Sequence, residues 1–126
     1  MSGFSFDSNI VIDALAGLAP ARAEMDRATS FGATAWISRA VWIEVMSKGQ
    51  GEGLIRAEKL MSGFGIDELD AEIARRAAAL RRERALLKAT DAIILATALT
   101  RGRVLITRNT KDFPAEMPGI RVPYIL

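Results

Sequence analysis

Histidine and cysteine are both absent from this sequence. Without histidine there is no Ser-His-Asp or Cys-His catalytic group and no histidine acid–base pair. Without either residue, an ordinary zinc site and a disulfide framework are also excluded. If the chain is an enzyme, carboxylates that hold a metal ion and help to activate water are the leading candidates for its chemistry. Serine, threonine, lysine and tyrosine remain remote alternatives.

Long hydrophobic runs are absent too, because no apolar stretch reaches the roughly 20 residues that a membrane span requires. The first residues also lack the basic start, the long apolar segment and the cleavage site of a signal peptide. The chain has 126 residues, of which 50% are hydrophobic and 25% are charged. We therefore expect a single globular domain over residues 1–126 that is cytoplasmic and has no membrane segment.

Positive charge is carried mainly by arginine, which supplies 13 of the 17 basic residues, although the formal net charge is only +2. Guanidinium groups suit phosphate recognition better than ammonium groups do. However, a composition rich in arginine and alanine also follows from a GC-rich genome. Composition alone therefore leaves nucleic-acid binding open.

Three acidic residues stand isolated in apolar segments. Asp7 follows the strand-like triplet FSF at residues 4–6, Glu44 lies within AVWIEVM at 40–46, and Asp91 lies within TDAIILA at 90–96. Burying a charge in such surroundings is costly unless something pairs with it. A shared cation would provide that pairing, and Mg²⁺ or Mn²⁺ is the natural cation for oxygen ligands.

Strand patterns alternate with helix patterns along the whole chain, which predicts an α/β sandwich with a mainly parallel central sheet. Sites in such sheets form beyond the carboxyl ends of the strands, and Asp7 and Asn109 each follow such an end. The expected strands are 4–6, 33–37, 64–66, 104–107 and 121–125. The expected helices are 8–16, 20–31, one capped by Ser38, one ending near 61, one capped by Asp70, and one from an N-cap at Thr90 to Gly102.

Four segments in this order resemble the PIN domain, and more specifically VapC-type toxins of bacterial toxin–antitoxin pairs. They are FDSNIVIDAL at 6–15, ISRAVWIEVM at 37–46, KATDAIILATAL at 88–99 and LITRNTKDF at 105–113. The resemblance spans nearly the whole chain and implies a Rossmann-like α/β/α sandwich. It also implies a homodimer that cleaves RNA with acids around Mg²⁺ or Mn²⁺, and a cognate VapB-like antitoxin that blocks the site.

Carried over by position, the resemblance assigns the first three family acids to Asp7, Glu44 and Asp91. Asp7 and Asp91 are then expected to bind the metal directly, and Glu44 to bind it directly or through water, or to orient the nucleophile. The fourth family position falls on Asn109, which has a carbonyl oxygen but no charge. If residues 109–113 form a helical turn, Asp112 faces the same site and supplies the charge that Asn109 lacks. Arg108 and Lys111 flank this position and are expected to reach the scissile phosphate.

Structural interpretations remain beside these functional ones. Asp7 and Asp91 are also suited to cap or open a helix, and Glu44 to a solvated helix face. We expect Asp13 to be solvated, and the arginines at 75–84 to form a solvated face rather than an RNA-binding one. Because Asn109 departs from the family pattern, the main alternative is a catalytically weak or inactive PIN-like module that binds RNA or a protein partner. A phosphoesterase that acts on DNA is a further alternative.

Overall fold

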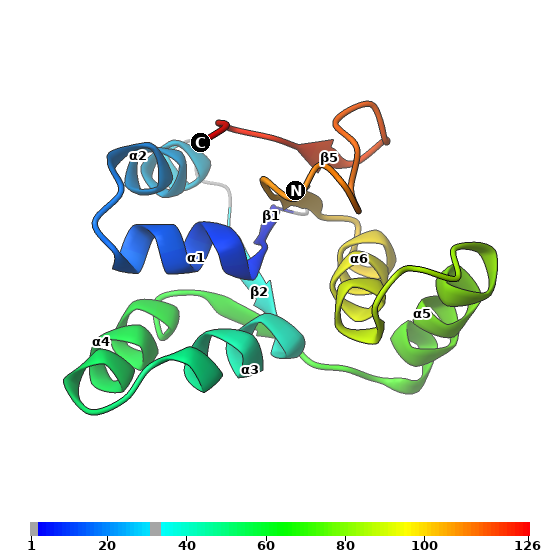
Figure 1. Cartoon of the computed structure of the whole chain (residues 1–126), viewed down its shortest axis with the longest axis horizontal. Coiled ribbons are helices and arrows are strands. Elements are labelled where there is room, and N and C mark those ends of the chain that lie inside the picture. The colour runs from blue at the N-terminus through cyan, green and yellow to red at the C-terminus, as the bar shows by residue number, and fades with distance from the viewer. Residues whose placement is uncertain (1–2, 31–33) are drawn as a thin grey trace.

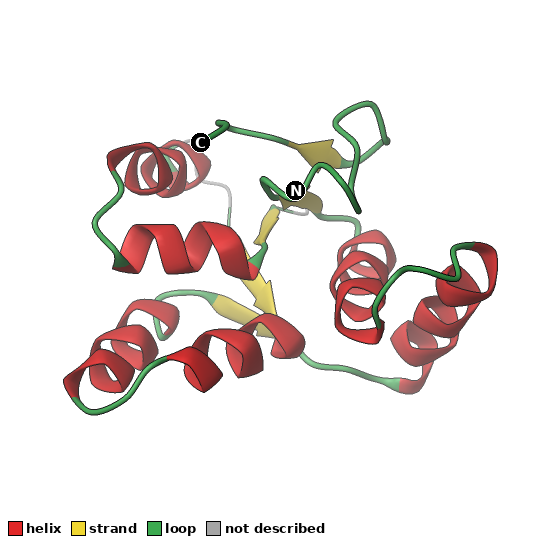
Figure 2. Cartoon of the chain, in the orientation of Figure 1, coloured by secondary structure: helices red, strands yellow, loops and turns green. Residues whose placement is uncertain are grey.

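Five parallel strands form the centre of this computed structural model, which describes residues 3–30 and 34–126. They are β1 (Phe4–Phe6), β2 (Ala35–Ser38), β3 (Gly65–Asp67), β4 (Val104–Ile106) and β5 (Ile120–Arg121). Their order across the sheet is β3-β2-β1-β4-β5, and every pairing is parallel. Figure 2 shows the strands in yellow among the helices. The expected parallel sheet is thus confirmed.

Six helices cover the two faces of this sheet. They are α1 (Ser8–Leu15), α2 (Ala19–Thr29), α3 (Arg39–Lys48), α4 (Glu52–Met61), α5 (Ala71–Glu83) and α6 (Ala89–Arg101). In Figure 1, α1 to α4 lie to one side of the strands, and α5 and α6 lie to the other. The chain steps outward from β1 to β3 and then returns across the sheet to β4, so right-handed crossovers place the helices on opposite faces. This is the expected α/β/α sandwich.

The core lies between the sheet and both helical layers. Phe6, Ile37 and Ile106 from the strands are completely buried, as are Ile10 from α1 and Ile94 from α6. Short strands that are buried on both faces are typical of parallel sheets, because helices cover each face. This packing fixes the carboxyl ends of β1 and β4 side by side, since these two strands pair along their whole length.

Several helix ends agree with the sequence. The Ser38 hydroxyl accepts a hydrogen bond from the Val41 N–H at 3.2 Å, and the Asp70 carboxylate accepts one from the Ile73 N–H at 2.9 Å. Gly102 ends α6 in the left-handed region, with φ at 69°. The expected N-cap at Thr90 is wrong, because α6 already begins at Ala89.

The last strand is shorter than expected, since β5 covers only Ile120–Arg121 and does not extend to residue 125. Pro123 lacks the N–H that a longer ladder would require. The expected end of the second helix at residue 31 and the expected start of the second strand at residue 33 lie outside the described residues. Among the described residues, no helix is both long enough and apolar enough to cross a membrane.

Candidate functional site

Asp7 lies where β1 ends and caps the N-terminus of α1, with only 3% of its surface exposed. Its carboxylate accepts hydrogen bonds from the Ser8 N–H at 2.7 Å, the Thr107 hydroxyl at 2.7 Å and the Asn9 side-chain amide at 3.4 Å. Burial raises the pKa of Asp7 despite these hydrogen bonds, which lower it. The capping interpretation is therefore correct, but capping alone does not explain why this acid is held in so buried a position.

Glu44 lies on α3 and points towards the N-terminus of α1, not outward as the solvated interpretation expects. Its Oε1 atom accepts a hydrogen bond from the Ser8 hydroxyl at 2.9 Å. Glu44 also contributes to the raised pKa of Asp7 by charge repulsion. Ser8 thus links the two acids, because its N–H binds Asp7 and its hydroxyl binds Glu44.

Asp91 lies in the first turn of α6 and is partly buried. Burial raises its pKa to about 6, with further contributions from the negative charges of Asp112, Asp7 and Glu44, while Lys88 acts in the opposite direction. A carboxyl responds to these neighbours only if they are close. The fold therefore brings Asp112, Asp7 and Glu44, which are far apart in the sequence, within range of charge interactions with Asp91.

Asp112 reaches this cluster through a turn that follows β4. The Phe113 N–H donates to the Asn109 carbonyl at 3.0 Å, and the Phe113 ring is fully buried. The Asn109 side-chain amide donates to the Asp112 carboxylate at 2.9 Å, and the Asp112 N–H donates to the Asn109 side-chain oxygen at 3.3 Å. The expected turn is present, and Asn109 holds the Asp112 side chain in place.

The acid cluster, which comprises Asp7, Glu44, Asp91 and Asp112, has no ion-pair partner among the described residues, 3–30 and 34–126. In the same described ranges, no three acids converge closely enough to form a ready-made metal site. The donor set nevertheless fits a hard cation, because carboxylate and amide oxygens are the ligands that Mg²⁺ and Mn²⁺ prefer.

Arg108 points away from the acid cluster. Its guanidinium donates to both carboxylate oxygens of Asp13, at 2.6 and 3.0 Å, and the Tyr124 hydroxyl donates to the same carboxylate at 2.7 Å. The expectation that Asp13 is solvated is wrong, because only 8% of its surface is exposed. The side of α1 that carries Asp13 faces Arg108 and the C-terminal segment and not the solvent. Lys111, in contrast, is exposed.

Sequence reasoning missed the uncharged residues that orient the acids, namely Ser8, Asn9 and Thr107. The Thr107 hydroxyl donates to Asp7 and accepts a hydrogen bond from the Asn109 N–H at 3.0 Å. It therefore connects the end of β1 with the turn that carries Asp112. The available signal was positional, because Ser8 and Asn9 are the two residues after Asp7, and Thr107 directly follows the end of β4.

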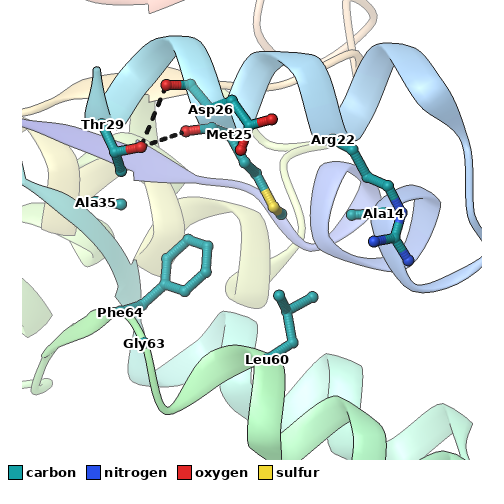
Figure 3. A pocket seen from close by; sticks show the side chains of 9 residues that line it. All are labelled: Ala14, Arg22, Met25, Asp26, Thr29, Ala35, Leu60, Gly63 and Phe64. Atoms are coloured by element: carbon teal, nitrogen blue, oxygen red, sulfur yellow. Dashed lines mark hydrogen bonds between the residues drawn. The ribbon is translucent and has the colours of Figure 1, made fainter. Parts of the chain in front are cut away.

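A separate cavity of about 390 Å³ lies between α2 and the α4–β3 connection. In Figure 3, Met25 from α2 extends towards Phe64 and Leu60 on the opposite side. None of the four acids lines this cavity, and Ala14 borders it near the end of α1 that is remote from Asp7. The cavity is therefore distinct from the acid cluster.

Comparisons with known proteins agree with this architecture. The chain matches the PIN domain family over residues 5–115. It is similar to a chain of a toxin–antitoxin complex from Klebsiella pneumoniae, with 40% identity and a TM-score of 0.87, covering 98% of this chain and 99% of that chain. It also resembles a chain of DNA-bound VapBC from Salmonella typhimurium, with 25% identity, a TM-score of 0.80 and 96% coverage of both chains.

VapBC2 from Rickettsia felis, bound to a promoter DNA fragment, contains a chain with the same fold at 20% identity. The TM-score is 0.78, and the match covers 93% of this chain and 94% of that chain. No curated protein sequence matches the chain significantly. Because the family match covers most of the sequence and the sheet order and helical layers agree with it, the chain belongs to the PIN domain family.

Proposed function

We propose that this protein is a Mg²⁺- or Mn²⁺-dependent endoribonuclease and the toxin of a VapBC-type toxin–antitoxin pair. The observation that carries the proposal is the acid cluster, whose charges repel one another and form no ion pair with lysine or arginine in the described part of the chain. Acids that repel one another in this way lower the stability of the fold unless a bound cation offsets their charge. Such destabilising arrangements are typical of functional sites. Phosphodiester hydrolysis is a reaction that such a site can catalyse, because a cation held by carboxylates activates water and neutralises charge on the phosphate.

Within this proposal, Asp7 and Asp91 would hold the cation, and Glu44 would bind it directly or through water, or orient the attacking water. Asp112 would supply the fourth carboxylate, because it is hydrogen-bonded to Asn109 at the fourth family position and its charge acts on Asp91. When bound, the cation neutralises charge on the phosphoryl oxygens and favours the ionised form of the attacking water. The role of Asn109 is then to orient Asp112 through its side-chain amide.

Ser8 and Thr107 keep the acids in fixed orientations during this reaction. Ser8 donates one hydrogen bond to Asp7 and another to Glu44, and Thr107 donates one to the other oxygen of Asp7. These donors leave each carboxylate with free lone pairs while restricting its rotation. An oriented set of oxygen atoms lowers the reorganisation that accompanies binding of a cation or a phosphate.

A cognate VapB-like antitoxin is the proposed partner. The Klebsiella relative comes from a toxin–antitoxin complex, and the Salmonella relative comes from a complex bound to DNA. By analogy, we propose that this chain acts in the cytoplasm and is inhibited by its antitoxin there. We also propose a homodimer, as the resemblance to VapC-type toxins implies.

The alternative of an inactive PIN-like module rests on Asn109, which removes one family carboxylate. The proximity of Asp112 to Asp91 weakens this alternative, because the cluster still contains four acids.

Cleavage of single-stranded or looped RNA in the presence of Mg²⁺ or Mn²⁺ tests the proposal. We expect EDTA to abolish cleavage. We also expect Asp91→Asn to abolish it while the far-UV circular dichroism spectrum stays native. Undiminished cleavage by protein stripped of metal would overturn the proposal.

A further inference from the structure

A cavity of about 350 Å³ lies beside the acid cluster, between the α5–α6 connection and the turn that follows β4. Asp112 lines it together with two basic residues, Arg84 and Lys111. The rest of its lining is residues 85–87. Asp112 therefore belongs both to the acid cluster and to this cavity. The two cations therefore lie beside one acid of the cluster.

Arg84 is placed so that part of its hydrogen-bonding capacity is unused. Its Nη2 atom donates to the Asp112 carbonyl at 2.5 Å. Its Nη1 atom is buried and has no hydrogen-bond partner within the described residues. A buried donor on a charged group is costly to leave unpaired, so native structures usually supply a partner. Guanidinium groups are especially well suited to phosphate oxygens as such partners.

The segment that carries this cavity is fixed to the body of the protein. Leu87 is almost fully buried, and its carbonyl accepts a hydrogen bond from Arg81 Nε at 3.0 Å. The contact between Arg84 and the Asp112 carbonyl ties the same segment to the turn after β4. The cations are therefore held near the acids by the fold. Arg108 cannot take this role without losing its ion pair with Asp13.

We propose that this cavity binds a phosphate of the RNA strand that neighbours the phosphate at the acid cluster, with Arg84 and Lys111 as its ligands. This inference rests on the proposed function. Carboxylates repel a polyanion, so cations beside the acid cluster offset part of that repulsion and fix the position of the strand. The class of ligand is a backbone phosphodiester, which makes the contact independent of base sequence.

RNA binding by an inactive form separates this inference from catalysis. We would measure fluorescence anisotropy of a short, labelled single-stranded RNA with the Asp91→Asn protein in Mg²⁺ buffer, over a series of salt concentrations. Adding Arg84→Gln should weaken binding about tenfold and reduce the slope of log K against log salt by roughly 0.7, the value for one lost phosphate contact. Arg84→Lys keeps the positive charge, so the slope of log K against log salt should stay at the value of the Asp91→Asn protein. Arg56→Gln, on the distant helix α4, should change neither quantity.

Lys111→Gln provides a second variant, because Lys111 is exposed and its replacement leaves the fold intact. It should also reduce the slope by roughly 0.7. Unchanged affinity and slope in both variants would overturn the inference. So would variants that bind RNA normally but bind the antitoxin less tightly, because the cavity would then receive an acidic side chain of that partner.

The proposed function and this inference can fail separately. If the wild-type protein does not cleave RNA but Arg84→Gln still weakens RNA binding, only the proposed function is wrong. If the wild-type protein cleaves RNA and both variants bind it with an unchanged salt slope, only the inference about this cavity is wrong.

Discussion

At the scale of single residues, Asp91 shows the conflict between stability and function in this protein. Its pKa is raised to about 6 by burial and by the charges of Asp112, Asp7 and Glu44. An acid whose pKa is higher in the folded state than in the unfolded state destabilises the fold once the pH exceeds both values. Without a bound cation, the ionised Asp91 therefore lowers the free energy of unfolding at neutral pH.

The Asp91→Asn variant should consequently be more stable than the wild type in metal-free buffer. We expect the Tm to rise by roughly 3–5 °C, equivalent to about 1 kcal/mol, since Asp91 is only partly buried and solvent screens part of the repulsion. The advantage should be larger at pH 7.5 than at pH 4.5, where the wild-type carboxyl is protonated. Differential scanning fluorimetry in EDTA measures the two Tm values at each pH. A lower Tm for the variant than for the wild type would contradict the repulsion between Asp91 and the other acids.

Asn109 permits a complementary test. Its amide donates to the Asp112 carboxylate at 2.9 Å, so Asn109→Asp would place two carboxylates in contact. We expect a lower Tm in EDTA, a larger rise on adding Mn²⁺, and less Mn²⁺ needed for half-maximal cleavage. Glu58→Gln, an exposed change on α4, is the control. If Asn109→Asp and the control respond equally to Mn²⁺, residue 109 has no influence on the cation.

At the scale of secondary-structure elements, Trp36 of β2 packs directly over Gly65 of β3. A Cβ atom on residue 65 would lie 2.5 Å from Cζ3 of the Trp36 ring. The Arg103 guanidinium covers the ring at 3.8 Å from its centroid and binds the Asp67 carboxylate at 2.8 and 2.9 Å. The ring therefore has little freedom to move away.

The Gly65→Ala substitution should thus destabilise the protein by about 1–3 kcal/mol, which is typical of overpacking. Gly53→Ala is the matched control, because Gly53 lies in α4 and nothing approaches its added Cβ within 4 Å. Its effect should be neutral or stabilising by up to about 1 kcal/mol. Urea denaturation compares the two, and equal stability changes would disprove the close packing at β3.

Glu24 of α2 binds two arginines, Arg27 on the same helix and Arg121 of β5, and the contact with Arg121 connects α2 to β5. Burial acts to raise its pKa, but hydrogen bonds and charge interactions with Arg27 and Arg121 prevail and lower the pKa to about 2. A carboxyl with a depressed pKa stabilises the fold above its unfolded pKa, and this contribution is lost as the pH falls towards 2. Glu24→Gln should therefore cost about 2 kcal/mol at pH 7.

The deficit of Glu24→Gln relative to the wild type should shrink as the pH falls from about 4.5 to 2. Urea denaturation of both proteins across this range tests the sign of the effect. A deficit that stays constant with pH would mean that the ionised form of Glu24 does not stabilise the contact between α2 and β5.

At the scale of the whole molecule, the regular elements were predictable because strand and helix patterns alternate and end at recognisable residues such as Ser38, Asp70 and Gly102. The isolated acids Asp7 and Asp91 could also be identified, since charges in apolar segments are unusual. Contacts across the fold were not predictable in this way. Asp13 was misjudged because helix periodicity places it on a different side of the helix from Asp7 but cannot show that Arg108 and Tyr124 cover that side.

The uncharged residues of the site were missed for the same reason. Thr107 follows Asp7 by 100 positions in the sequence, yet its hydroxyl lies 2.7 Å from the Asp7 carboxylate. Only the pairing of β1 with β4 brings the two together. Local sequence patterns predict which residues begin or end an element, whereas partners across parallel strands depend on the order of strands in the sheet.

Binding of Mn²⁺ to the metal-free protein, measured by titration calorimetry, tests the central claim that the acid cluster is a site for a divalent cation. The wild type and the Glu58→Gln control should bind Mn²⁺ with the same affinity. Asp91→Asn should bind it at least about tenfold more weakly, since one anionic oxygen ligand is lost. Equal affinity in all three proteins, or no binding to the wild type, would contradict the claim.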